Sequence, residues 1–313
     1  MGVLKHKVKG GVYSSYRDKW RKETYLGKPG SEEAKEKLVE AQITETKKEL
    51  GLLGRKLENL EQKLAENFSA GVPTNVDEIG LPVNQILKGD SFEWLSKFRD
   101  NTIHFAVTSP PYNLGLPYDV YDDKKEYDDY RNYLKKVWAQ TFRILVDGGR
   151  FALNIAPTGI ADFKQVHFDL VADVQSVGFT FRAEMVWYKQ NMGRHTAWGS
   201  FQSPSNPHVI PSWEYVYVFH KNSPKLAGVK EDIDIAPEEF MKASDAFWRI
   251  QPETKRNGHP APFPEPLIER LLKFYTYRGN ICLDMFGGTG TLAVVAAKNY
   301  RKYISIDISK EYR

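Results

Sequence analysis

Short apolar runs alternate with segments of helical pattern from about residue 84 to the end of this 313-residue chain. Each run has the length of a strand, and in chain order the runs are QILKGD, HFAVTS, RFALNIA, FRAEMVWYK, EYVYVFHK, NICLDMF and KYISIDI. Strands that alternate with helices form βαβ units, whose sheets are mostly parallel and covered by helices. The rhythm therefore predicts an α/β fold with a mostly parallel sheet.

The first 82 residues follow a different pattern. Residues 1–30 are basic and aromatic, which predicts either a basic N-terminal arm on a nucleic-acid backbone or a solvated terminus. Residues 31–82 are predicted to form a helical segment and a linker. Apolar residues of this helix recur in steps of four and three, with Thr46 in one place, at Val39, Ile43, Leu50, Leu53, Leu57, Leu60 and Leu64. This stripe predicts either a homodimer through a heptad-like helix or packing on the same chain, and Gly51 and Gly54 allow a helical hairpin.

Charge and cysteine content limit the partners and cofactors. The formal net charge of +4 is compatible with nucleic-acid binding but does not argue for it alone. Cys282 is the only cysteine and the seven histidines show no metal-ligand spacing, so we expect neither a disulfide within the chain nor a metal site. The chain has no apolar run of the ~18 residues that a membrane span needs. We therefore expect a cytoplasmic protein with no membrane partner.

Two stretches carry candidate chemistry. The first, TSPPYN at residues 108–113, follows the apolar run HFAV, and its prolines must end that strand because proline cannot donate to a sheet. The second, ICLDMFGGTGTLAVVAA at residues 281–297, reads as a strand, a glycine turn and a helix, and the next strand ends in Asp307. Glycines let the backbone approach a ligand, and an acid at the end of the second strand commonly holds ribose hydroxyls. The second stretch thus predicts an adenosine-containing cofactor, or else a tight turn without a ligand.

The two stretches can meet in space although nearly the whole α/β region separates them. Ligands of open α/β sheets bind outside the carboxyl ends of the strands, and both stretches follow such ends. Their order along the chain, TSPPY, then HPAPFP, then FGGTGT, resembles the β-class of S-adenosylmethionine-dependent DNA amino-methyltransferases, whose motifs are circularly permuted. The resemblance covers about residues 84–313 and extends to Gly89-Asp90 and to the segment from Trp198 to Phe219. It implies a Rossmann-like methyltransferase fold, S-adenosylmethionine as cofactor and double-stranded DNA as partner.

The resemblance also implies a role for each matching residue. It implies a catalytic loop formed by Ser109, Pro110, Pro111 and Tyr112. It implies a cofactor site whose adenine and ribose ends meet Asp90 and Asp307, and whose turn contains Asp284, Phe286, Gly288, Gly290 and Thr291. It implies that the methionine moiety lies beside His259, Pro260, Phe263 and Pro264. The family usually has proline where this chain has Met285.

By the same resemblance, residues 83–189 form the catalytic half, residues 190–258 a target-recognition insertion and residues 259–313 the cofactor-binding half. Apart from the strand EYVYVFHK, the insertion is predicted to be long loop. Its candidates for contacts with base edges or phosphates are Arg194, His195, Trp198, Gln202, Ser203, Asn206, Lys255, Arg256 and Asn257, any of which can equally be an ordinary surface residue. The chain has no room for a nuclease domain, so a cognate restriction endonuclease would be a separate chain.

The catalytic loop suits amine chemistry. An exocyclic amine is a weak nucleophile, and two fixed acceptors, the Ser109 side chain and the Pro110 carbonyl, can each take an N–H and aim it. Tyr112 offers an aromatic face on which a flipped-out base can stack. Cys282 lies within a predicted buried strand, so we do not expect it to attack the base as a nucleophile. Serine at position 109 favours N4 of cytosine over N6 of adenine within the family. Adenine N6, an RNA or protein substrate and a non-catalytic DNA-binding protein remain the alternatives.

Overall fold

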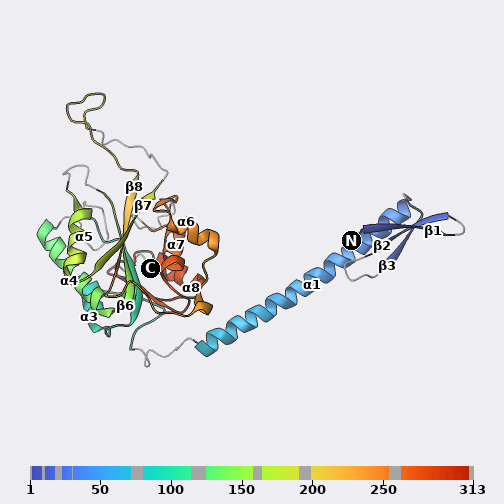
Figure 1. Ribbon diagram of the computed structural model, residues 1–313, viewed down its shortest axis with the longest axis horizontal. Coiled ribbons are helices and arrows are strands. Elements are labelled where there is room, and N and C mark those ends of the chain that lie inside the picture. The colour runs from blue at the N-terminus through green and yellow to red at the C-terminus, as the bar shows by residue number, and fades with distance from the viewer. Residues whose placement is uncertain are drawn as a thin grey trace. The chain divides into compact units, whose positions relative to one another are not determined.

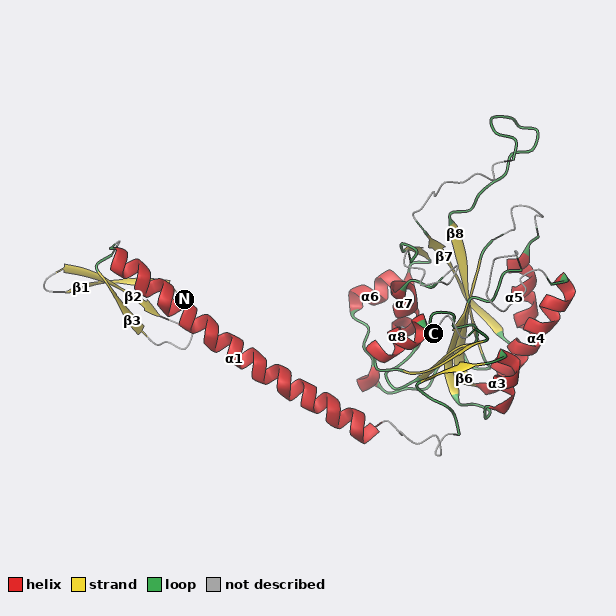
Figure 2. Ribbon diagram, turned by 180° about the vertical axis from the view of Figure 1, so that it is seen from behind, coloured by secondary structure: helices red, strands yellow, loops and turns green. Residues whose placement is uncertain are grey.

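The structure, a computed structural model, describes residues 2–8, 11–17, 23–29, 31–71, 80–113, 125–157, 164–189, 199–253 and 262–309. The chain divides into two compact units, Met1–Thr74 and Asn75–Arg313 (Figures 1 and 2). The larger unit contains both of the stretches to which the sequence assigns chemistry.

A three-stranded antiparallel sheet and one long helix make up the first unit. These elements are β1 (Gly2–Val8), β2 (Gly11–Arg17), β3 (Glu23–Gly27) and α1 (Glu32–Gly71). Leu26 of β3 is buried against Ala34 of α1. Parts of residues 1–30 therefore form regular strands, which the sequence analysis did not predict, while the basic arm stays a prediction. The missed signal is the Lys9-Gly10 pair, which separates two runs of strand-forming sequence by the length of a hairpin turn.

Helix α1 continues without a break through Gly51 and Gly54, so the helical hairpin is wrong. The side chains of the predicted stripe are described as far as Leu53. They are largely exposed in this unit, at 53% for Val39, 49% for Ile43, 63% for Leu50 and 61% for Leu53. The stripe is thus not buried on the strands that precede it, which pack on another face of the helix.

The second unit is built on an eight-stranded sheet with strand order β4-β11-β10-β5-β6-β8-β7-β9. The strands are β4 (Gln85–Lys88), β5 (Ile103–Thr108), β6 (Leu145–Ile155), β7 (Thr180–Tyr188), β8 (Trp213–His220), β9 (Phe247–Arg249), β10 (Ile281–Asp284) and β11 (Lys302–Asp307). Neighbouring strands are parallel except at β8, which is antiparallel to both β6 and β7. The N-terminal end of β8 therefore lies at the same edge as the carboxyl ends of the other strands. Although β10 comes late in the chain, it pairs with β5, as the permuted motif order predicts.

Helices cover both faces of this sheet and give three layers (Figure 1). One face carries α3 (Ser91–Lys97), α4 (Tyr127–Ile144) and α5 (Val166–Ser176), and the other carries α6 (Pro237–Ser244), α7 (Glu265–Tyr275) and α8 (Thr291–Lys298). Trp138 of α4 packs on Phe151 in the first core, and Leu271 of α7 belongs with Phe105 to the second. The predicted fold class is confirmed, as is the N-terminal helical segment. No helix of the described ranges has the length and apolarity that a bilayer span requires.

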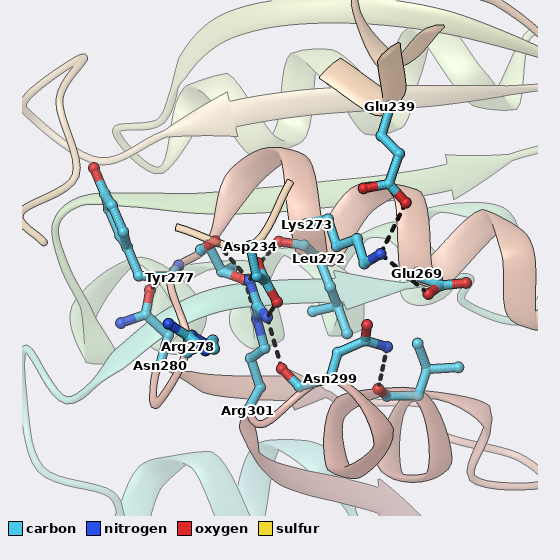
Figure 3. A network of polar contacts seen from close by, with 12 residues as sticks. Asp234, Glu239, Glu269, Leu272, Lys273, Tyr277, Arg278, Asn280, Asn299 and Arg301 are labelled. Atoms are coloured by element: carbon cyan, nitrogen blue, oxygen red, sulfur yellow. Dashed lines mark hydrogen bonds and ion pairs between the residues drawn. The ribbon is translucent and has the colours of Figure 1, made fainter. Parts of the chain in front are cut away.

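Residues 229–250 contain regular structure where the sequence predicted a long loop, namely η1 (Lys230–Asp232), α6 and β9. The buried guanidinium of Arg301 fastens this segment to the sheet, since it pairs with Asp234 and donates to Thr276 Oγ1 at 3.0 Å (Figure 3). Lys273 of α7 also holds Glu239 of α6 at 2.9 Å. Helix α6 is short and depends on such distant partners, which local sequence patterns do not reveal.

Candidate active site

The loop after β5 is held rigid on both sides of its prolines. Ser109 follows the last residue of β5, and Pro110 is buried. The Tyr130 hydroxyl on α4 donates to the carbonyl oxygen of Pro111 at 2.8 Å. Asn113 has a positive φ of 57° and exchanges hydrogen bonds of 2.9 and 2.8 Å with the main chain of Lys125. These contacts fix the position of the Ser109 side chain and of the Pro110 backbone.

Five polar side chains, two from this loop and three from the neighbouring strands and their ends, form one hydrogen-bonded cluster. The hydroxyls of Ser109 and Tyr112 lie 2.8 Å apart. The Tyr112 hydroxyl donates to Glu214 Oε2 at 3.1 Å. The amide of Asn154 donates to the Tyr112 oxygen at 3.0 Å and to Glu214 Oε2 at 2.6 Å. Lys189 forms an ion pair with the other oxygen of Glu214. The Ser109 hydroxyl is therefore one end of a chain of hydrogen-bonded side chains that runs through Tyr112 to Glu214.

Strand register explains why these residues meet. Thr108 of β5 lies opposite Leu153 of β6, so Asn154 stands beside Ser109. On the next strand, Val216 lies opposite Asn154. Because β8 is reversed, its second residue, Glu214, comes to the catalytic edge of the sheet.

The cluster forms one wall of a cavity of about 160 Å³. Its lining residues are Ser109, Tyr112, Asn154, Trp187, Lys189, Glu214, Pro252, Glu253, Pro262 and Phe263. Burial, reinforced by the charge of Glu214, raises the pKa of Tyr112 well above its usual value of 10.0. The phenol therefore keeps its proton at neutral pH and acts as a hydrogen-bond donor.

The glycine turn after β10 requires its glycines. Gly288 and Gly290 adopt positive φ values of 49° and 76°. A Cβ on Gly287 would lie 1.9 Å from Ser305 Oγ, so no other residue fits between the turn and β11. The Gly288 N–H donates to Asp307 Oδ2 at 2.8 Å, which places the Asp307 carboxylate directly against the turn.

A hydrogen bond joins the catalytic strand to the cofactor strand. Thr108, the residue before Ser109, donates through Oγ1 to Asp284 Oδ1 at 2.8 Å. The N–H of Phe286 donates to the same oxygen at 3.0 Å. Asp284 is fully buried, and burial raises its pKa to about 7 despite these two donors. The two stretches singled out in the sequence therefore lie side by side.

The structure places the other predicted cofactor residues around the same strand ends. Asp90 follows β4, where its carboxylate accepts hydrogen bonds from the Glu93 N–H at 3.0 Å and the Tyr133 hydroxyl at 2.7 Å. The Gly89 N–H donates to the Asp307 carbonyl oxygen at 3.0 Å, which keeps the ends of β4 and β11 together. Asp90 therefore caps α3 as well as standing next to the predicted ribose acid.

The remaining predicted cofactor residues lie just before α7 and in the glycine turn. Phe263 lines the cavity, and its carbonyl oxygen accepts a 3.3 Å hydrogen bond from Thr291 at the start of α8. Pro264 immediately precedes α7. Phe286 packs edge-on against Trp138, with ring centroids 6.4 Å apart. Met285, which stands where the family usually has proline, is fully buried, and its carbonyl oxygen accepts a hydrogen bond from Ser91.

Most of the predicted DNA contacts lie outside the described residues. These are Arg194, His195, Trp198, Lys255, Arg256 and Asn257, together with the cofactor candidates His259 and Pro260. Gln202, Ser203 and Asn206 belong to a loop between β7 and β8 that extends beyond the sheet (Figure 1). Their loop is closed by a bridge between Gly199 and Pro207, and none of the three lines the cavity.

Three residues of the cluster, Asn154, Lys189 and Glu214, were not among the predicted site residues. Asn154 and Glu214 each interrupt a run of apolar or aromatic residues, FALNI in β6 and WEYVYVF in β8, and this exception to the pattern was a usable signal. Lys189 directly follows β7, at the same edge. Within the described ranges, His, Cys, Asp and Glu side chains form no group of three that could hold a metal ion.

Comparisons with known proteins agree with this geometry. Residues 103–313 match a family model described as DNA methylase, of the N6 and N4 type. The type II methyltransferase M.MjaVI of Methanocaldococcus jannaschii is 36% identical over 158 residues, which are 50% of this chain and 81% of that protein.

Two solved structures are similar in fold. A protein of Thermus thermophilus, assigned as a DNA modification methylase and solved with S-adenosyl-L-methionine, has a TM-score of 0.57 and 26% identity, over 72% of this chain and 90% of its own. The cytosine-N4-specific PvuII DNA methyltransferase has a TM-score of 0.58 over 73% of this chain and 83% of its own. At 20% identity, the second likeness concerns the fold alone.

Proposed function

Because this chain belongs to the DNA methylase family of S-adenosylmethionine-dependent N6 and N4 amino-methyltransferases, we propose that it methylates N4 of a flipped-out cytosine at a specific site in duplex DNA. One observation carries the assignment of the site. The 2.8 Å hydrogen bond between Thr108 and Asp284 joins the serine loop to the glycine turn, so that a base amine and a methyl donor would meet between them. The cavity that lies between Ser109 and Phe263 supports the same arrangement.

The residues present fit S-adenosylmethionine. The Asp307 carboxylate would hold the ribose hydroxyls, the main chain of the glycine turn would lie beside the cofactor, and Phe263 would flank the methionine moiety. The buried acid Asp284 suits a cationic ligand. When bound, S-adenosylmethionine supplies an electrophilic methyl group on a sulfonium.

The catalytic loop would orient the target amine by hydrogen bonds and would form no covalent bond with the base. The Ser109 hydroxyl and the Pro110 carbonyl oxygen are two acceptors on a backbone that Tyr130 and Lys125 hold in place. Each acceptor would take one N–H of the target amine, so that the nitrogen lone pair faces the methyl group. Tyr112 would stack on the base, which must leave the helix to reach this cavity. Cys282 plays no part, since it is fully buried and burial raises the pKa of its thiol to about 12.

Serine at position 109 supports cytosine N4 as the target. The family resemblance associates serine at this place with cytosine and aspartate with adenine. Adenine N6 remains the second candidate, because the acceptor geometry at Ser109 and Pro110 serves either amine. Transfer of tritium from labelled S-adenosylmethionine to duplex DNA, single-stranded DNA and RNA tests the substrate class. Label in duplex DNA is the expected result, and a protein that binds the cofactor but labels no nucleic acid would contradict the proposal.

Cofactor affinity should rise with pH between about 6 and 8. Asp284 has a pKa of about 7 in the free protein because it is buried, so at pH 6 it is mostly protonated. A cationic ligand favours the carboxylate, so binding at low pH must first remove this proton. Titration calorimetry in buffers of different ionisation enthalpy measures both the affinity and the released proton. The Asp284→Asn variant should show no such dependence, and a flat wild-type profile would remove Asp284 from the cofactor site.

We further propose that the exposed stripe of α1 pairs with the same stripe of a second chain. A 3.5-residue apolar repeat needs a matching helix, and Lys56 and Glu61 flank it where parallel coiled coils place opposite charges. Leu53→Lys should therefore convert a dimer to a monomer in sedimentation equilibrium. Leu52→Lys is the matched control, since Leu52 is exposed but lies off the stripe. A monomeric wild-type protein would refute the pairing.

A partner enzyme would complete the biological role. The relative M.MjaVI is described as a type II methyltransferase. We propose that this chain protects DNA from a cognate endonuclease encoded as a separate chain.

A further inference from the structure

The cluster behind Ser109 has few possible arrangements of protons. Ser109 and Tyr112 each carry one hydroxyl proton, an ionised Glu214 can only accept, and the amide nitrogen of Asn154 can only donate. The raised pKa of Tyr112 means that the phenol is neutral and has one proton to place. The direction of the remaining hydrogen bonds can be worked out from this inventory.

Tyr112 has two acceptors within reach of its proton, Glu214 Oε2 at 3.1 Å and Ser109 Oγ at 2.8 Å. The carboxylate is the better acceptor, since charge-assisted hydrogen bonds are roughly twice as strong as neutral ones. Once Tyr112 donates to Glu214, the short contact between the hydroxyls requires Ser109 to donate to the phenolic oxygen. The nearest other donor, the Asn154 amide, stands at 3.5 Å from Ser109 Oγ. This long hydrogen bond occupies at most one lone pair of Ser109, so the other is left for a donor in the cavity.

Glu214 is held as the acceptor by two neighbours. Lys189 pairs with Oε1, and Asn154 donates to Oε2 at 2.6 Å. The Glu214 side chain is only 12% exposed, so its charge is largely withdrawn from water and needs these partners. A purely structural role would be to join β7 to β8. The strand ladder already pairs Trp187 with Glu214 at this point, so the ion pair is not needed for that.

We infer that Glu214 is a positioning residue for methyl transfer, which keeps Ser109 an acceptor and receives, through Tyr112, the proton that the amine loses. This inference rests on the proposed function. After the amine nitrogen bonds to the methyl group, it carries one proton in excess. That N–H bond breaks as the proton moves to Ser109 Oγ, the serine proton moves to the Tyr112 oxygen, and the phenol proton moves to Glu214 Oε2. One N–H bond is lost, one carboxyl O–H bond is formed, and both hydroxyls are restored.

The Glu214→Gln variant tests this, because it keeps the shape of the side chain and removes its charge. Single-turnover methylation of duplex DNA should slow by about a hundredfold, as expected for a lost proton acceptor, while the affinity for S-adenosylmethionine stays unchanged. The Glu214→Asp variant, which keeps a carboxylate, should recover part of the rate that Glu214→Gln loses, whereas a merely structural role predicts no such recovery. The groups that contact the Glu214 carboxylate are Lys189 after β7, Tyr112 in the loop and Asn154 of β6.

Two further variants make the test specific. Glu184→Gln removes an exposed acid of β7 that does not line the cavity, and should keep the wild-type rate. Tyr112→Phe interrupts the same chain but keeps the ring. If the two groups act in one chain, the double variant Glu214→Gln with Tyr112→Phe should be no slower than the slower single variant.

The outcomes separate this inference from the proposed function. A folded Glu214→Gln protein with the wild-type rate would overturn the inference, while methyl transfer by the wild type would still support the function. Losses that multiply in the double variant would also overturn it. If Glu214→Gln does not fold, Tyr112→Phe decides, because a wild-type rate in that variant would refute proton transfer through Tyr112. A wild type that transfers no methyl group contradicts the proposed function itself.

Discussion

Replacement of Tyr112 by alanine should slow methyl transfer by about a thousandfold and leave the affinity for S-adenosylmethionine nearly unchanged. Stacking of one base on an aromatic ring is worth about 1–3 kcal/mol, which accounts for part of the loss. The remainder comes from Ser109, whose hydroxyl loses the 2.8 Å contact that sets its orientation. Single-turnover rates and calorimetric cofactor titrations measure the two quantities separately.

The Tyr112→Phe variant divides this effect into its two parts. It keeps the stacking surface and removes only the hydroxyl that contacts Ser109, Asn154 and Glu214. We therefore expect a rate between those of the wild type and Tyr112→Ala. Wild-type turnover in Tyr112→Ala would refute the assignment of this loop as catalytic, and a weakened cofactor affinity would move Tyr112 into the cofactor site instead.

Replacement of Asp307 by alanine should weaken cofactor binding by about a hundredfold. Two hydrogen bonds from ribose hydroxyls to a carboxylate are each worth about 1.5–3 kcal/mol, which is ample for this loss. The change also leaves the N–H groups of Gly288 and Ser309 without their acceptor, at 2.8 and 2.7 Å in the intact protein. The turn should therefore loosen as well as lose its ribose contact.

The control for this experiment is an acid far from the turn. Asp129 is exposed in the first turn of α4, so Asp129→Ala should leave the cofactor affinity unchanged. A thermal melt of each variant without cofactor reports whether the fold survives. An unchanged affinity in a folded Asp307→Ala protein would exclude Asp307 from the cofactor site.

The main elements of the catalytic unit were predictable because their signals are local. The strands that carry Ser109, Asp284 and Asp307 are apolar runs that end at proline, glycine or an acid, and the structure has them at those places. The pairing of β5 with β10 followed from the motif order, since both stretches belong at the carboxyl edge of one sheet. Hydrophobic periodicity alone does not predict that β5 and β10 are neighbours in the sheet.

The positions of Glu214 and Asn154 beside the catalytic loop were not predictable from local signals. Glu214 reaches Ser109 only because β8 is reversed between β6 and β7, and strand direction depends on contacts that are distant in sequence. Asn154 is brought to the same point by register, which one residue of slip would change. Helix α6 and strand β9 were missed for a related reason, since the buried pair of Arg301 and Asp234 holds that segment. The sheet of the first unit was missed because its basic composition outweighed its strand pattern.

The measurement that tests the central claim most directly is the identity of the methylated nucleoside. The protein is incubated with isotopically labelled S-adenosylmethionine and mixed-sequence duplex DNA, the DNA is digested to nucleosides, and these are separated by mass. We expect the label in N4-methylcytosine, because Ser109 is the first residue of the catalytic loop. Label in N6-methyladenine instead would contradict cytosine as the target, while leaving the fold and the cofactor as described.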